Sequence, residues 1–327
     1  MNVLLVCHAG AGVGLGHLTR SIVAARALTQ EIDANVSLLI QGDPVQRTDL
    51  GLFSHRFIER TDSLLAAIGD QVRRLDVQVV ILDLHARLVP ADIGACLEDL
   101  RRQDRKVVSI DGLGDHRGNL DLLFVPSFRS SPASSRAEAP SISGWDCFLL
   151  DVKRPPIPWR PGKRVLALAG GSDATGLGEV LPTLLNSALP VGTELHWVTG
   201  PYARQPVLPA SPRFSISNHQ SPLDLNDLMA QTNYALTVYG VSFYESLYYG
   251  TPTVVFSPYG DKDDDELDVV AREGVALRAS DEVDAVAKLK RLMADDALAA
   301  SLSERARQKL AGSGGRKLAR AVAQLLG

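Results

Sequence analysis

A histidine and an arginine, three residues apart, follow a run of alternating glycines near the start of the chain. Glycines occupy positions 10, 12, 14 and 16, and His17 and Arg20 come next. Glycine lets backbone N–H groups approach an anion, and the N-terminus of a following helix favours negative charge. That helix end disfavours imidazolium, so we expect His17 to be neutral near pH 7, as a general base must be. His17 is therefore the candidate catalytic residue, and Gly14, Gly16 and Arg20 are candidate substrate contacts.

These side chains also have simpler interpretations. His17 could be a packing or capping histidine. Arg20, on nearly the same helix face, could contact phosphate, support His17 or be solvated. His8, before the glycines, is expected to be structural.

A second glycine turn repeats this arrangement in the other half of the chain, where a strand ends at Gly170-Gly171-Ser172-Asp173. Gly170 and Gly171 permit close backbone approach, and the Ser172 hydroxyl can donate to a phosphate oxygen. The same four residues also make a good turn and helix N-cap. The likeness to the first glycine loop favours phosphate binding.

A third candidate is the helix start at Gly240-Val241-Ser242, with Glu245 one turn later. A carboxylate can accept hydrogen bonds from two ribose hydroxyls, and Ser242 can bind a phosphate. However, Ser-x-x-Glu is also a capping box, in which both side chains serve the helix itself. The pattern alone favours the capping box.

Polar residues follow two strands of the first half. Asp83 and His85 come after one strand and Asp111 after the next, so they either line a sugar or acceptor pocket or form turns. The acidic run at 261–266 could suggest Mg²⁺, but acids at a helix start are the simpler interpretation.

Other site types lack their motifs. No frame of the first glycine run gives G-x-G-x-x-G, and no acid ends the second strand, so a nicotinamide cofactor is disfavoured. The three cysteines are scattered, and no Cys/His set has metal-ligand spacing. We therefore expect neither a cofactor nor a metal.

The elements that position these residues alternate between short apolar runs and longer amphipathic runs. This alternation predicts an α/β fold with parallel sheets covered on both faces. Ligands of such sheets lie beyond the carboxyl ends of the strands. The expected strands are Val3–Cys7, Val36–Ile40, Val77–Leu82, Lys106–Ile110, Leu122–Val125, Val165–Leu168, Glu194–Val198, Phe214–Ser217, Tyr234–Val238 and Thr253–Phe256. The expected helices are His17–Thr29, Ser63–Arg74, Pro90–Gln103, Leu177–Ser187, Leu223–Gln231, Phe243–Tyr249, Glu266–Arg272 and a tail from Ala285 to Leu326 broken at residues 312–315.

The chain of 327 residues has room for two domains. A Ser/Pro/Ala-rich loop is expected at 127–140, and four prolines mark 155–162 as a linker. We expect Rossmann-like domains at 1–155 and 163–327, facing across a cleft.

Composition excludes several classes of protein. Hydrophobic residues make up 45%, as in soluble globular proteins, and 38 acidic against 34 basic residues give a net charge of −4. A dedicated nucleic-acid binder is disfavoured because it would carry a basic excess. The chain has no apolar run of the ~18 residues that a membrane span needs, and its N-terminus has no basic region typical of a signal peptide. We expect a cytoplasmic location.

Taken together, these junctions resemble the GT-B class of nucleotide-sugar enzymes. The similarity is to the branch that contains the UDP-sugar hydrolase of pseudaminic acid biosynthesis and the predicted glycosyltransferases of spore-coat polysaccharide synthesis. One helix start also resembles that of the lipid-linked peptidoglycan N-acetylglucosaminyltransferase. The matching stretches, in order, are 14–20, 108–113, 121–123, 144–155, 169–173 and 241–245.

The resemblance implies a role for each junction. His17 would be the base that activates an acceptor hydroxyl or water, and Glu245 would hold the ribose of a UDP-sugar. Gly171, Ser172 and Ser242 would hold the diphosphate without a metal. The acceptor would be a sugar or glycan, with membrane contact only if it is lipid-linked.

The chain departs from the hydrolase pattern at three places. It has His8-Ala9-Gly10-Ala11-Gly12 where that branch carries R-x-D-x-S, Leu150-Asp151 where it has Leu-Arg, and His85 where it has tyrosine. We therefore favour a glycosyltransferase over a hydrolase with the same site. An NAD(P)-dependent oxidoreductase and a non-catalytic nucleotide-sugar sensor are the alternatives from other classes.

Overall fold

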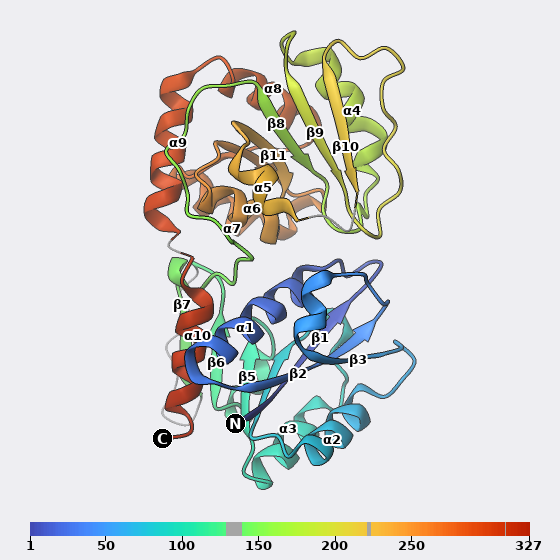
Figure 1. Ribbon diagram of the computed structural model, residues 1–327, viewed down its shortest axis with the longest axis vertical. Helices are drawn as coiled ribbons and strands as arrows, with labels where there is room; N and C mark the ends of the chain where they lie inside the picture. Colours follow the sequence, from blue (N-terminus) through green and yellow to red (C-terminus); the bar gives the residue numbers. More distant parts are fainter. Residues whose placement is uncertain (129–138, 221–223, 311) are drawn as a thin grey trace. The chain divides into compact units, whose positions relative to one another are not determined.

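The computed structural model describes residues 1–128, 139–220, 224–310 and 312–327 (Figure 1). These residues divide into two compact units. Unit 1 comprises Met1–Leu150 and Gly312–Gly327, and unit 2 comprises Asp151–Ala311. The loop expected at 127–140 lies largely outside the described residues.

The described part of unit 1 contains a seven-stranded sheet in the order β3-β2-β1-β4-β5-β6-β7, and its paired strands are all parallel. The central strands are apolar on both faces because helices cover both. The strands are β1 (Asn2–Ala9), β2 (Asn35–Gly42), β3 (Ser54–Ile58), β4 (Val79–Asp83), β5 (Lys106–Ile110), β6 (Leu122–Val125) and β7 (Ser141–Ser143).

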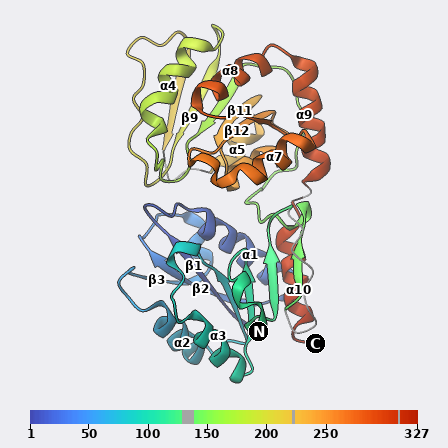
Figure 2. The same cartoon turned by 180° about the vertical axis from the view of Figure 1, so that it is seen from behind.

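Two helices pack on each face of this sheet. α1 (Gly16–Ile32) and α10 (Gly314–Gln324) share one core with it, and α2 (Leu64–Leu75) and α3 (Ile93–Arg102) contribute to the core of the other face (Figures 1 and 2). Short 3₁₀ turns are η1 (Thr48–Leu52), η2 (Ala86–Leu88), η3 (Gly114–Asn119) and η4 (Trp145–Cys147).

The described part of unit 2 repeats this plan with six parallel strands in the order β10-β9-β8-β11-β12-β13. Helices α4, α8 and α9 pack on one face, and α5 packs on the other. The strands are β8 (Arg164–Leu168), β9 (Glu194–Thr199), β10 (Ser215–Gln220), β11 (Tyr234–Val238), β12 (Thr253–Phe256) and β13 (Leu277–Arg278). The helices are α4 (Leu177–Ala188), α5 (Leu225–Ala230), α6 (Val241–Tyr248), η5 (Gly260–Asp263), α7 (Asp264–Glu273), α8 (Glu282–Leu292) and α9 (Asp296–Lys309).

Each expected strand lies on an observed one, with ends shifted by a few residues. Three strands were not expected, namely β3, β7 and β13. β3 reads Ser-His-Arg-Phe-Ile and is largely exposed at the sheet edge, and the other two are only three and two residues long. The expected helical tail has a further break between α8 and α9, where Asp295 caps α9.

The structure corrects the prediction of a linker at 155–162. These residues belong to unit 2, and the chain instead passes from unit 1 to unit 2 between Leu150 and Asp151. The Trp159 indole donates to the Asn233 carbonyl at 2.8 Å and packs edge-on against Tyr234. The prolines therefore mark an extended strap on unit 2.

The structure also corrects the predicted bounds of the second domain, 163–327. Residues 312–327 belong to unit 1. The apolar stripe of α10, which includes Leu318 and Val322, is buried in the core that α1 shares with the sheet. Glycines allow this approach. A Cβ at Gly314 would lie 2.3 Å from the Phe148 carbonyl oxygen, and one at Gly315 would lie 3.0 Å from the Ala27 Cβ.

Because of this close approach, Gly314→Ala tests the packing of α10 against the rest of unit 1. We expect the added methyl to displace α10 and to lower the free energy of unfolding by ~2 kcal/mol, as overpacking does. Urea denaturation measures the change. Gly51→Ala is the control, because nothing lies within 4 Å of its added Cβ. Equal stability of the two variants would contradict the packing described for α10.

Candidate functional site

The first cluster lies where the strand order of unit 1 reverses, between β1 and β4. In open α/β sheets, ligands bind beyond the carboxyl ends of the strands at such a switch point. The loop after β1 leads to His17 and Arg20 on α1, and β4 ends at Asp83. Three expected site residues, His17, Arg20 and Asp83, thus lie at the position that the topology favours for a ligand.

Strand register explains why Asp83 reaches α1. Asp83 pairs with Cys7 of β1, and Cys7 belongs to the core that α1 covers. Side chains of paired residues point to the same face of a sheet. The Asp83 carboxylate is fully buried, and its Oδ1 lies 2.7 Å from Nδ1 of His17.

The contact with Asp83 fixes which nitrogen of His17 can act as a base. Nδ1 also lies 3.1 Å from Nη2 of Arg20, but a guanidinium only donates, so Nδ1 cannot serve both partners. The shorter, charge-assisted bond assigns the Nδ1 proton to Asp83. Nε2 is then the unprotonated nitrogen, and no residue of the described chain is hydrogen-bonded to it.

Arg20 forms hydrogen bonds to two carboxylates, those of Asp83 and Asp111. Its Nε and Nη2 donate to Asp83 at 3.1 and 2.6 Å, and its Nη1 donates to Asp111 at 3.0 Å. Burial alone would raise the pKa of Asp83, but Arg20 and His17 outweigh it and hold that pKa below its usual range. In the same way, burial disfavours the Arg20 cation, while Asp83 and Asp111 restore it and raise its pKa. The buried pair is therefore ionised.

A second layer of polar groups supports this cluster from the other face of the sheet. The buried Gln41 amide donates to the carbonyls of Glu59 and Asp62, so its oxygen must accept from Nε2 of His8 at 3.2 Å. His8 Nδ1 is then free to accept from the backbone N–H of His85 at 3.0 Å. The His85 ring lies edge-on to His17, with centroids 5.7 Å apart. His8 thus has the structural role that the sequence predicts.

The turn after β5 places Asp111 beside Arg20. Asp111 and Leu113 both have positive φ, 64° and 60°, which non-glycine residues rarely adopt. Two bonds hold the turn, from the Asp111 N–H to the Phe124 carbonyl at 2.9 Å and from the Ser109 hydroxyl to the Gly112 carbonyl at 2.7 Å. Such strain is typical of functional turns.

The first glycine loop folds back on itself. Gly10 and Gly14 are bridged through their backbone groups, and the Ala11 N–H donates to the Asp43 carboxylate at 2.8 Å. Gly14 has φ 78°, and Gly16 begins α1, whose N-terminus has no side-chain cap. The first turn of α1 therefore has no side-chain cap from its N-cap residue, Leu15.

Unit 2 has its own switch point, between β8 and β11. Gly170 (φ 87°), Gly171 and Ser172 form the turn after β8. The next residue, Asp173, caps α4 by accepting from the N–H groups of Leu177 and Gly178, both at 2.8 Å. The capping interpretation is thus correct for Asp173, while the glycines and Ser172 stay at the strand end.

The helix after β11 excludes the capping box that the pattern favours. Gly240 is the N-cap of α6 and makes no side-chain cap bond, so Val241 and Ser242 already lie in the first turn. Glu245 is 6% exposed and accepts from the Asp151 N–H at 3.2 Å instead of closing a box. The α6 N-terminus, adjacent to the Gly170 turn in sheet order, thus has no side-chain bond from its N-cap residue.

Sequence reasoning missed some neighbours of these loops. Gln41 lies near the end of β2, and Asp43 directly follows that strand. Tyr259 follows β12, and its pKa is raised by burial and then by the nearby Asp263 and Asp173 charges. The sequence signal for them is their place at or shortly after the end of a strand.

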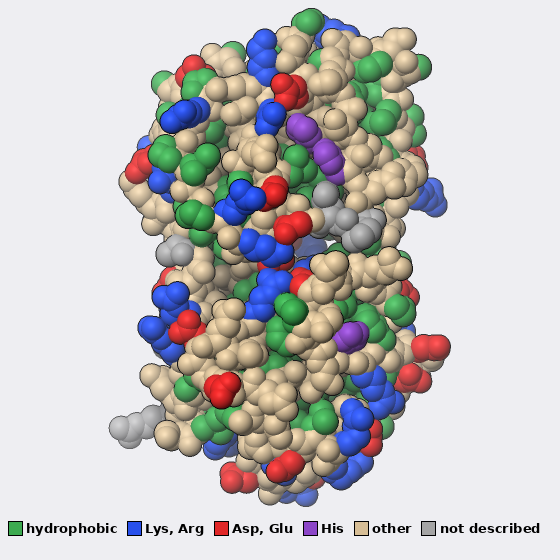
Figure 3. All heavy atoms as spheres, viewed as in Figure 1, with side chains coloured by type: hydrophobic (Ala, Val, Ile, Leu, Met, Phe, Trp, Pro, Cys, Tyr) green, Lys and Arg blue, Asp and Glu red, His purple; other side chains and the backbone are tan. Residues whose placement is uncertain are grey.

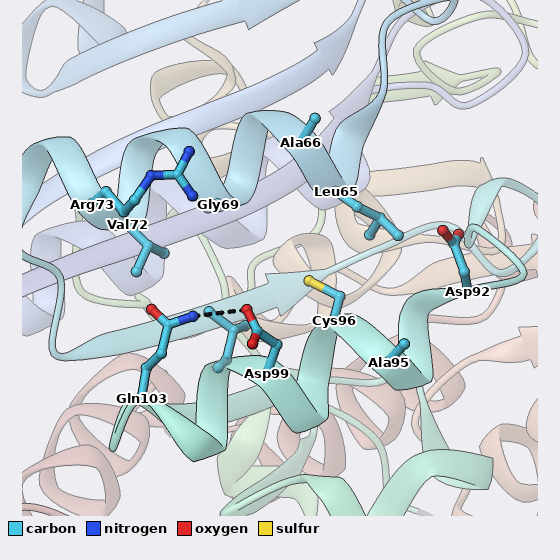
Figure 4. A pocket seen from close by; sticks show the side chains of 11 residues that line it. Leu65, Ala66, Gly69, Val72, Arg73, Asp92, Ala95, Cys96, Asp99 and Gln103 are labelled. Carbon is cyan, nitrogen blue, oxygen red and sulfur yellow. Dashed lines mark hydrogen bonds between the residues drawn. The ribbon is translucent and has the colours of Figure 1, made fainter.

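Other features of the described residues do not join the site. A pocket of about 440 Å³ lies between α2 and α3, with Leu65, Val72 and Cys96 in its lining and Asp99 bonded to Gln103 at its edge (Figure 4). None of its lining residues belongs to the predicted set. No group of three or more His, Cys, Asp or Glu side chains that could hold a metal occurs in the described part. In the acidic run, Asp263 accepts from Ser257 and Asp264 pairs with Arg278.

Comparisons with known proteins agree on the architecture. No protein-family model and no curated protein matches the sequence. Solved structures do match. MurG of Acinetobacter baumannii is 15% identical, with 99% of each chain covered and a TM-score of 0.66. UGT2 of Phytolacca americana, complexed with UDP-2-fluoro-glucose and pterostilbene, is 14% identical, with 99% of each chain covered and a TM-score of 0.69.

The chain has the GT-B fold, with two Rossmann-like units. S. aureus MnaA bound to UDP extends the agreement, at 12% identity, 99% and 96% coverage and a TM-score of 0.65. In GT-B terms, the His17 cluster belongs to the first unit and the Gly170 and Gly240 loops to the second.

The surface matches the charge balance of the sequence. Acidic and basic side chains are interspersed over the face shown in Figure 3, without a continuous basic stripe. Among the described helices, none has the length and apolar character to span a membrane.

The His8 tautomer predicts a pH dependence of stability. Burial, with the nearby His17, lowers the pKa of His8 from 6.5 to about 4. Below pH 6.5 the unfolded chain binds a proton there and the folded chain does not, so stability falls between pH 6.5 and 4, by ~3 kcal/mol for this shift. His8→Asn keeps an acceptor for the His85 N–H but does not titrate. Its urea-unfolding curve should lose this slope, and a slope equal to that of the wild type would contradict the assignment.

Proposed function

We propose that the protein is a glycosyltransferase that uses a nucleotide-activated sugar, with UDP as the nucleotide, and that His17 is its general base. The observation that carries the proposal is the His17–Asp83 pair at the switch point of a GT-B unit, with Nε2 directed away from Asp83. The same pair with water as acceptor would be a hydrolase, but nothing in the comparisons supports that alternative. An acceptor hydroxyl is therefore the proposed nucleophile.

The chemistry follows from the assigned tautomer. Nε2 of His17 takes the proton of an acceptor hydroxyl as its oxygen attacks the anomeric carbon of the donor. The bond from that carbon to the diphosphate oxygen breaks, and UDP leaves with the electron pair. Asp83, bonded to Nδ1, stabilises the imidazolium that forms.

The donor is assigned to unit 2. Gly170, Gly171 and Ser172 are proposed to contact the diphosphate, together with the α6 N–H groups at Val241 and Ser242. Backbone donors and a helix N-terminus can stabilise this charge without a metal ion, which fits a chain with no basic excess. Gly240 lets the diphosphate approach the start of α6, and Glu245 is proposed to bind the ribose hydroxyls.

The acceptor is assigned to unit 1, where His17 lies. Asp111 and His85 flank His17 and are proposed to contact a sugar or glycan, with Gly14 and Gly16 contributing backbone donors. UDP is the proposed nucleotide because UGT2 and MnaA were solved with UDP-containing ligands. A cytoplasmic location stays a prediction.

Donor binding can be measured without knowing the acceptor. We expect thermal shift and calorimetry to show binding of UDP and of UDP-sugars, with no stabilisation by NADH. Glu245→Gln should weaken UDP binding ~10-fold, since it removes a charge-assisted acceptor. Glu179→Gln, an exposed change on α4, is the control. Equal UDP affinity of the two variants would remove Glu245 from the donor site.

The base has its own test. His17→Ala should lower turnover of a UDP-sugar and its glycan acceptor by ~10²-fold or more, with UDP affinity unchanged. His55→Ala is the matched control, because His55 lies exposed on β3 of the same unit. Turnover within a factor of two of the wild type would exclude His17 as the base. Stoichiometric release of UDP and free sugar without acceptor would contradict transfer.

A further inference from the structure

Arg20 carries the most hydrogen bonds of the side chains in the described His17 cluster, yet it does not face solvent. Its side chain is 13% exposed, and Nε, Nη1 and Nη2 each donate to a carboxylate oxygen. We propose that Arg20 is a positioning residue of the reaction, holding Asp83 and Asp111 with one guanidinium and thereby setting the charge that His17 faces. This inference rests on the function proposed above.

The geometry disfavours the other role predicted for Arg20, that of a phosphate contact. A diphosphate could engage the guanidinium only by displacing one of its carboxylates. Displacing Asp83 would leave a fully buried carboxylate with a weaker set of partners, which is strongly unfavourable. Arg20 therefore acts through Asp83, Asp111 and His17.

The charges of the cluster explain what Arg20 contributes. Asp83 and Asp111 are anionic and Arg20 is cationic, so with neutral His17 the four side chains carry one net negative charge. Without Arg20, His17 would face two uncompensated carboxylates and would hold its proton at higher pH.

The remaining groups around His17 do not replace this cation. His85 packs edge-on against it from the loop after β4, and His8 lies behind from β1. Burial keeps His8 neutral by lowering its pKa. Lysine at position 20 would keep the charge but not the planar fork that reaches two carboxylates at once.

A double-variant cycle tests the pairing without any activity assay. Arg20→Met keeps the length of the side chain and removes its charge, which should lower the melting temperature by ~10 °C because Asp83 loses its counter-ion. Adding Asp83→Asn should recover more than half of that loss. Additive effects of the two changes would contradict the pairing.

Kinetics and pH profiles test the positioning role. Arg20→Lys should lower kcat ~10-fold or more with little change in the KM of the donor, because an ammonium lacks the planar fork. In Arg20→Met, which lacks the charge, the acidic limb of the pH–kcat/KM profile should move up by about one pH unit. Added guanidinium should restore part of the turnover of Arg20→Ala. Arg26→Met is the control: Arg26 lies two turns further along α1 and pairs with Asp49. Its kcat and pH profile should equal those of the wild type.

The outcomes of these experiments distinguish a failure of the positioning role from a failure of the proposed function. A larger donor KM with unchanged kcat would overturn the positioning role and make Arg20 a phosphate contact. An unmoved acidic limb would also overturn it. If the wild type turned over no UDP-sugar but the stability cycle held, the proposed function would fail while the Arg20–Asp83 pairing stood.

Discussion

The fully buried carboxylate of Asp83 is the constraint on which the first unit depends. An ion at the end of a core strand must be paired, because an unpaired buried charge is strongly destabilising. His17 and Arg20, one turn apart on α1, supply the partners at 2.7 and 2.6 Å. This pairing fixes the orientation of α1 on the sheet, selects the tautomer of His17 and brings Asp111 to the same guanidinium. One electrostatic requirement thus shapes both the packing and the proposed chemistry.

The two units gather different kinds of groups at their switch points. Unit 1 gathers ionised side chains at its switch point, whereas unit 2 gathers glycines, a serine and an uncapped helix start. The first arrangement suits proton transfer and the second suits an anionic diphosphate. A net charge of −4 is compatible with this division, since the proposed donors in unit 2 are backbone N–H groups and not lysines.

The sequence predicted the elements well where hydrophobic pattern decides them. The buried runs of β1, β4 and β11 and the glycine turns after them were expected. The exposed edge strand β3 was not, because its pattern is polar. The linker prediction failed because prolines report only an extended backbone, and the contact of Trp159 with Asn233 lies 74 positions away in sequence. The bond between Arg20 and Asp83 was out of reach for the same reason, since strand register sets it. At Ser242 the local pattern suggested a capping box, but the helix begins two residues earlier than that box requires.

The most direct test of this account is the turnover of Asp83→Asn with a UDP-sugar and glycan acceptor, measured beside UDP affinity on the same sample. An asparagine amide can donate to Nδ1 and so favours the wrong tautomer of His17, with the proton on Nε2. The account predicts that kcat falls ~10²-fold or more while UDP binds as tightly as in the wild type. A variant that binds UDP normally and keeps kcat within a factor of two would contradict it.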